Sequence, residues 1–124
     1  MQGQEESQQE QLYKWQCKNF PAEDLLKLTK EELIHMVKIL QVALGVCEEA
    51  GEVAHAVLKG TQKIREGENG FPKDLICDGI GDMHIYANQL LSMVNMDIQK
   101  CIQDTITHVL KRDWIENPTD GKIK

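Results

Sequence analysis

Two groups of carboxylates lie inside two separate apolar stretches of the chain. The first group is Glu48, Glu49 and Glu52, and the second is Asp78 and Asp82. Carboxylates spaced by three or four residues share one face of a helix. Two such helices laid side by side would gather these carboxylates in one pocket. A half-buried acidic cluster cannot remain ionised without cations, and oxygen ligands select hard metals, so we expect Mg²⁺, with Mn²⁺ as a substitute.

The helical periodicity places these acids at the margins of apolar stripes. Glu49 falls on the edge of the stripe in its segment, and Glu52 lies one step further out. Asp82 sits at the margin of the second stripe, with Asp78 beside it. Acids in such positions can point into a cleft between helices; the alternative is a solvated acidic face. The first stripe is predicted to comprise Val42, Val46, Ala50, Val53, Ala54, Val57 and Leu58.

The elements that carry these acids are predicted to be helices. Thr29 and Glu32 form a capping-box pattern at the start of a long helix that ends at Lys59-Gly60. Pro72 opens a second helix, and Asp97 caps a third that runs to about Asp113. A short amino-terminal helix containing Leu12, Tyr13 and Trp15 precedes them. The expected main helices cover residues 30–59, 73–93 and 98–113.

The predicted fold class is therefore all-α: a bundle of three main helices plus a short N-terminal helix. The apolar faces are wide for so small a chain, so we expect homo-oligomerisation, as a homodimer or dimer of dimers, to complete the core. Residues 1–10 are expected to be a flexible N-terminal segment, residues 11–116 one domain, and residues 117–124 a loose tail.

Composition narrows the class of protein. The chain has 124 residues and a formal net charge of −6, which argues against general nucleic-acid binding. No apolar run approaches the length that spans a membrane, and no signal peptide is recognisable, so a cytoplasmic location is the default. Four widely separated cysteines show no zinc-binding spacing.

The motif residues resemble a known family. The segment from Gly45 to Val53, then Lys59-Gly60, then Gly79 to Asp82, resembles the MazG-like nucleotide pyrophosphohydrolases of the all-α NTP pyrophosphatase superfamily. The resemblance covers roughly residues 33–112. It implies a MazG-like helical bundle and Mg²⁺-dependent hydrolysis of a nucleoside triphosphate to a monophosphate and pyrophosphate, in the service of nucleotide-pool house-cleaning.

The resemblance assigns roles to particular residues. Glu49 and Glu52 match the first pair of metal ligands, and Asp82 matches the final one. The chain departs from the family where it has Gly79 in place of the second glutamate of E-x-x-D. Asp78 is the replacement, one turn before Asp82, as a metal ligand or as a catalytic carboxylate. Glu48 is the other candidate for taking a proton from the attacking water.

Cations and aromatic residues complete the predicted site. Lys111 and Arg112, and then Lys59, are the preferred phosphate-binding residues, with Lys63 and Arg65 as further candidates. Trp15 and Phe20 are predicted to stack on the base, and Trp114 is an alternative. His55 is expected to be an ordinary exposed histidine, and His84 faces away from Asp82.

Two alternatives remain open. One is a relative with a narrower substrate, such as dUTP or phosphoribosyl-ATP. The other is a non-catalytic helical oligomerisation or regulatory protein. This alternative remains because Gly79 stands where the family has a glutamate.

Overall fold

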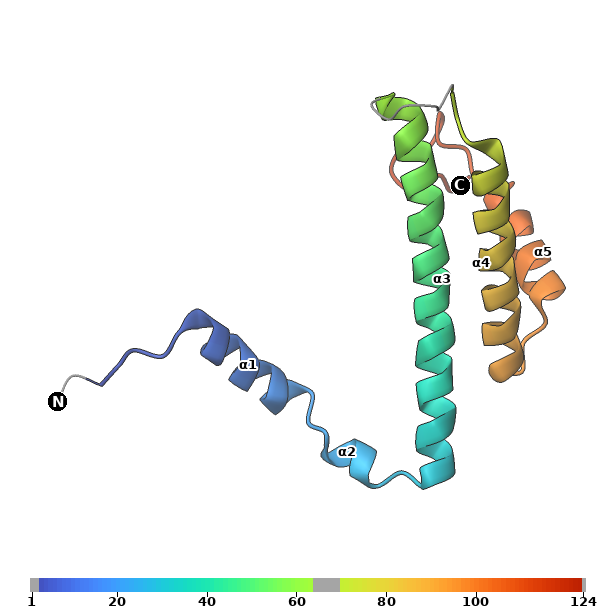
Figure 1. The fold of residues 1–124 in the computed structure, drawn as a ribbon. Helices are drawn as coiled ribbons and strands as arrows, with labels where there is room; N and C mark the ends of the chain where they lie inside the picture. The colour runs from blue at the N-terminus through green and yellow to red at the C-terminus, as the bar shows by residue number, and fades with distance from the viewer. Residues whose placement is uncertain (1–2, 64–69, 124) are drawn as a thin grey trace. The chain divides into compact units, whose positions relative to one another are not determined.

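The chain is all-α in the part described by the computed structural model, which comprises residues 3–63 and 70–123. These residues form five helices and no strand: α1 Gln8–Asn19, α2 Glu23–Leu26, α3 Lys30–Gln62, α4 Lys73–Met93 and α5 Ile98–Val109 (Figure 1). The short helix α2 was not expected from the sequence. The chain divides into two compact units, Met1–Val37 and Lys38–Lys124, with the boundary inside α3. Within the described ranges, no helix has the combination of length and apolarity needed to cross a membrane.

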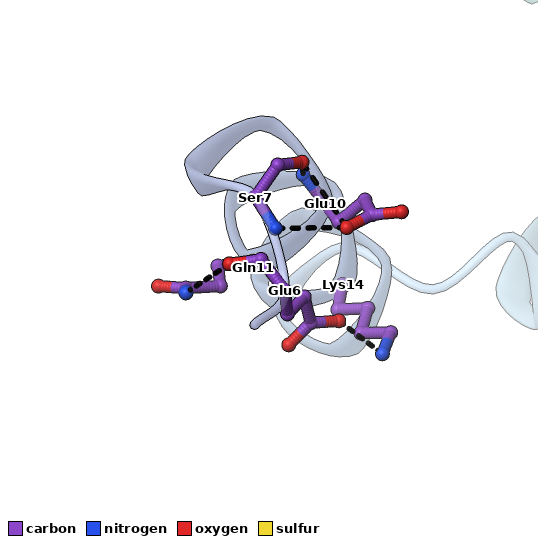
Figure 2. A network of polar contacts seen from close by, with 5 residues as sticks. All are labelled: Glu6, Ser7, Glu10, Gln11 and Lys14. Atoms are coloured by element: carbon purple, nitrogen blue, oxygen red, sulfur yellow. Dashed lines mark hydrogen bonds and ion pairs between the residues drawn. The ribbon is translucent and has the colours of Figure 1, made fainter. Parts of the chain in front are cut away.

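The first unit contains a well-capped α1. The hydroxyl of Ser7 accepts a hydrogen bond from the Glu10 amide at 3.2 Å, and the Glu10 carboxylate accepts one from the Ser7 amide at 2.9 Å (Figure 2). Lys14, further along α1, forms an ion pair with Glu6, which precedes the cap. Helix α1 therefore begins inside the segment 1–10, where Ser7 and Glu10 supply a reciprocal cap. The flexibility of that segment stays a prediction.

Helix α3 begins as predicted and ends later than predicted. Thr29 and Glu32 form the expected capping box, with N–O distances of 2.7 and 3.1 Å. The predicted end at Lys59-Gly60 is wrong, because α3 continues to Gln62 and Lys63 takes the left-handed conformation that closes it (φ 53°). Gly60 is buried inside the helix, and a Cβ there would lie 2.7 Å from the ring of Phe71. Gly60 therefore serves packing rather than termination.

In the second unit, α3 and α4 run antiparallel and approach closely at two glycines (Figure 1). A Cβ on Gly45 of α3 would fall 2.5 Å from the ring of Tyr86 on α4. A Cβ on Gly79 of α4 would fall 2.6 Å from the Cγ2 atom of Val53 on α3. The missing Cβ of Gly79 lets the backbones of the two helices come close, and the missing Cβ of Gly45 leaves room for the Tyr86 ring.

The face of α3 that packs inward differs in part from the predicted stripe. Val42, Gly45, Ala56 and Gly60 are buried, and Val46, Ala50 and Val53 are half-buried. Ala54, Val57 and Leu58, predicted to lie on the same stripe, are exposed. The reason is that Tyr86 and Phe71 pack against Gly45 and Gly60, and a stripe drawn from apolar side chains leaves both glycines out.

Very little of the chain is buried in this single copy. Among the described residues, Val42 and Ala56 are the buried hydrophobic side chains, while Leu26, Leu44 and Ile85 are 83%, 67% and 64% exposed. Completion of the core by a second copy stays a prediction.

Helix α5 contacts α4 and is followed by a hydrogen-bonded turn, while the looseness of the tail 117–124 stays a prediction. Asp97 caps α5 as predicted, accepting a hydrogen bond from the Lys100 amide at 2.8 Å. The helix ends at Val109, four residues short of Asp113, because the chain turns back. The Asp113 amide donates a hydrogen bond to the Gly121 carbonyl at 2.7 Å, and the backbones of Arg112 and Lys122 form an isolated antiparallel bridge. No helix or turn pattern in the sequence predicts these contacts, because each joins backbone groups that are several residues apart.

Candidate functional site

A pocket of about 560 Å³ lies between α3 and α4, in the second unit. Helix α3 contributes residues three and four positions apart, which is the spacing of one helical face. Helix α4 contributes a shorter row with the same spacing. The lining residues are Glu48, Gly51, Glu52, His55, Ala56 and Lys59 from α3, and Leu75, Asp78, Gly79 and Asp82 from α4. The structure thus brings Glu48, Glu52, Asp78 and Asp82 to one cavity, whereas Glu49 is not among its lining residues.

Glu49 is the acid most affected by its surroundings. Its Oε2 atom is buried and has no hydrogen-bond partner. Burial raises the pKa of Glu49 above its ordinary value of 4.5, and the negative charges of Glu52 and Asp82 raise it further. Burying a carboxylate oxygen without a hydrogen-bond donor destabilises the folded chain, so binding a proton or a cation at Glu49 would be stabilising.

The packing around Gly79 explains why the chain departs from the E-x-x-D pattern at this position. Its position faces the backbone of α3: a Cβ there would lie 2.6 Å from Val53 and 3.8 Å from the Glu49 carbonyl oxygen. A glutamate side chain at this point would collide with α3. Asp78, the neighbouring residue, lines the pocket instead.

The donor chemistry of the pocket fits a hard cation, although the ligands are not arranged around one point. Carboxylates predominate, and the unpartnered oxygen of Glu49 is the kind of group that a cation would satisfy. Within residues 3–63 and 70–123, no three His, Cys, Asp or Glu side chains are grouped closely enough to hold one ion. Binding a cation would therefore require these flexible side chains to turn toward it.

Two basic residues of α3, Lys59 and His55, also contribute to the pocket, and His55 is exposed, as the sequence predicted. Both line the pocket, and Lys59 is half-buried. His55 lies three residues after Glu52 and four before Lys59, so its helical spacing was a usable signal. His84, which was discounted, does not line this pocket.

Lys111 and Arg112 lie in a different pocket, of about 640 Å³, formed where the chain turns back after α5. It is strongly basic, with His108 and Lys122 in its lining. Arg112 also lies over the Trp114 ring, 5.9 Å from the ring centre. Neither Lys111 nor Arg112 lines the acidic pocket between α3 and α4.

The remaining candidates lie elsewhere in the chain. Trp15 and Phe20 belong to the first unit, where their rings form an edge-to-face pair 6.0 Å apart and both side chains are exposed. Their stacking on a base stays a prediction. Arg65 lies outside the described residues.

Comparison of the chain with models of protein families, with curated proteins and with solved structures gives no match.

Proposed function

We propose that the chain is a Mg²⁺-dependent pyrophosphohydrolase of nucleoside or deoxynucleoside triphosphates, of the MazG-like type. The observation that carries the proposal is the convergence of Glu48, Glu52, Asp78 and Asp82 on one pocket from two helices. The unpartnered buried oxygen of Glu49 beside them supports a cation in that place.

In the proposed reaction, water attacks the α-phosphorus, the bond from that phosphorus to the bridging oxygen breaks, and the monophosphate and pyrophosphate leave. Glu49, Glu52, Asp78 and Asp82 would hold Mg²⁺. The bound cation would reverse the sign of the field that otherwise repels a triphosphate and would polarise its oxygens. Glu48 or Asp78, whichever is not bound to the cation, would accept the proton of the attacking water.

Cations near the acidic pocket would hold the rest of the phosphate chain. Lys59 lines the same pocket. Lys111 and Arg112 would reach from the basic turn after α5. Trp15 and Phe20 would supply an aromatic surface for the base. The enzyme would act as a homodimer or dimer of dimers in the cytoplasm, removing unwanted nucleotides.

The test is release of pyrophosphate from a panel of NTPs and dNTPs, with Mg²⁺, with Mn²⁺ and with EDTA. Glu52→Gln should lower turnover by about 100-fold or more, as expected for loss of one charged group at the reacting centre. Glu31→Gln is the matched control, because Glu31 is an exposed acid in the first turn of the same helix. Equal turnover by both variants, or release of orthophosphate alone, would contradict the proposal.

Two other functions remain as candidates. A narrower enzyme, for dUTP or phosphoribosyl-ATP, would hydrolyse one member of the panel only. A non-catalytic oligomerisation or regulatory protein is favoured by the lack of a pre-arranged ligand group in the described residues. It would show no turnover and no Mg²⁺ binding by calorimetry, with the helices intact.

A further inference from the structure

The pocket after α5 gathers positive charge in an acidic chain. It has a volume of about 640 Å³ and shares no lining residue with the acidic pocket between α3 and α4. Three of its residues carry a permanent positive charge, although the net charge of the chain is −6. We call its lining the basic turn: His108, Leu110, Lys111, Arg112, Lys122 and Ile123.

The backbone holds two of these cations side by side. Arg112 and Lys122 face each other in an isolated antiparallel bridge. Residues that are directly opposite in such a bridge have Cα atoms about 4.5–5.5 Å apart, with both side chains on one face. Like charges in these positions repel each other and weaken the pairing. The hydrogen bond from the Asp113 amide to the Gly121 carbonyl, at 2.7 Å, nevertheless keeps the bridge closed.

Acids of the same segment do not neutralise these cations. The carboxylates of Asp113 and Asp120 accept hydrogen bonds from backbone amides, each at 3.0 Å. Within residues 3–63 and 70–123, no ion pair involves Lys111, Arg112 or Lys122. An anion from outside the chain would therefore relieve a repulsion that the fold itself leaves in place.

An aromatic ring positions one of the cations. The guanidinium of Arg112 lies over the Trp114 ring, 5.9 Å from the ring centre. The ring lies against Gly121, where a Cβ would stand 2.9 Å from it and where φ is 67°, a conformation that glycine adopts at low cost. A cation–π contact consumes no N–H donor, so the donors of Arg112 remain available to an anion. Trp114 is thus a positioning residue for Arg112.

The helix dipole accounts for only part of this cluster. Cations near the last turn of a helix interact favourably with its carbonyl end, which explains His108 and Lys111. Lys122 lies outside the helix and reaches the pocket because the chain turns back. A shared anion explains why Lys122 stands opposite Arg112, whereas the dipole does not.

We propose that the basic turn binds the phosphoryl group of an organic phosphate, without Mg²⁺ and outside the acidic pocket. Lys111, Arg112 and Lys122 donate charge-assisted hydrogen bonds to its oxygens. Leu110 and Ile123, which are 79% and 69% exposed, line the same pocket and contact the carbon part of the ligand. A bare phosphate ion would leave both of these apolar side chains unused. Two sources present this chemistry, a soluble organic phosphate and a phospholipid headgroup.

Calorimetric titration in EDTA tests the site with phenyl phosphate and with inorganic phosphate. Phenyl phosphate should bind saturably and more tightly than inorganic phosphate. Lys122→Gln should weaken its binding by about tenfold or more, as expected for loss of a hydrogen bond to a charged group, and Lys122→Arg should restore most of the affinity. Lys38→Gln is the matched control, because it removes the same charge from an exposed lysine of α3 outside both pockets.

Sedimentation with lipid vesicles separates the two sources. Vesicles of phosphatidylcholine are compared with vesicles that also contain phosphatidic acid. Saturable binding of phenyl phosphate assigns a soluble ligand, whereas binding to phosphatidic acid vesicles alone assigns the headgroup; in both cases Lys122→Gln should weaken it and Lys38→Gln should not. Equal binding by these two variants, or no binding to either probe while circular dichroism shows intact helices, would overturn the proposal.

The acidic pocket is excluded as the binding place by a further variant. Asp82→Asn changes that pocket and should leave the affinity for the phosphate probe unchanged in EDTA. Loss of binding in Asp82→Asn would overturn the proposal, because the probe would then occupy the acidic pocket. Probe binding without pyrophosphate release from nucleotides refutes only the hydrolase, and pyrophosphate release without probe binding refutes only the site in the basic turn.

Discussion

The two glycines of the Gly79-Ile80-Gly81 sequence should respond in opposite ways to the same substitution. Gly81 is exposed, and a Cβ there would meet nothing within 4 Å. At Gly79, a Cβ would stand 2.6 Å from the Val53 Cγ2 atom, a separation that real Cβ atoms essentially never show. Both residues lie inside α4, so their helix propensities are comparable.

The expected magnitudes follow from these surroundings. Replacing a helical glycine by alanine removes backbone freedom from the unfolded chain, which stabilises by about 0.5–1 kcal/mol. Gly81→Ala should gain this amount in the free energy of unfolding. Gly79→Ala gains the same propensity but overpacks the helix crossing, at a cost of about 1–3 kcal/mol. The two variants should therefore differ by about 1–3 kcal/mol, with Gly79→Ala the less stable.

The assay is urea unfolding followed by circular dichroism, at one fixed protein concentration because association would shift the midpoint. Val53→Ala removes the methyl group that obstructs position 79. In that background, Gly79→Ala should lose most of its cost, which a double-mutant cycle measures as coupling. Equal stabilities of the Gly79→Ala and Gly81→Ala variants, or zero coupling to Val53, would refute the packing described for α3 and α4.

Two further substitutions test the electrostatics and the caps. Because burial and the charges of Glu52 and Asp82 raise the pKa of Glu49 in the folded chain, the fold should lose stability as the pH rises through that raised pKa. Glu49→Gln should therefore be the more stable protein at neutral pH in EDTA, with the difference vanishing below pH 4.5 in thermal unfolding; a constant difference across that range would contradict the assignment. Asp97→Ala, which removes the cap of α5, should lower the free energy of unfolding by about 1 kcal/mol in the same urea assay. Asp97→Asn keeps a side-chain oxygen that can accept the same hydrogen bond, so this variant should retain most of the wild-type stability.

Local patterns in the sequence predicted the helices well. The Thr29 capping box, Pro72 at the start of α4 and the Asp97 cap are all confirmed. Local spacing also placed the acids of each helix on one face, but it left a solvated acidic face open, and only the packing of α3 on α4 brings four of them to one pocket. Their roles as ligands and bases stay predictions.

Features that depend on distant parts of the chain were not predictable in this way. Gly60 has the sequence signature of a helix end, but the approach of Phe71 decides its role. The burial of Gly79 likewise depends on the approach of α3, which no pattern within α4 contains. The turn after α5 depends on a backbone hydrogen bond from Asp113 to Gly121, across a segment whose composition suggested looseness.

The contact of Phe71 with Gly60 bears on where this protein would tolerate insertion. Lys63 closes α3 through its own backbone conformation, and Phe71 packs on Gly60 just before α4 begins. The alignment of the two acid-bearing helices is thus set by residues on either side of positions 64–69. A peptide tag or reporter inserted between those flanking residues would leave that alignment intact, which makes the connection a practical place for labels and for new chain ends.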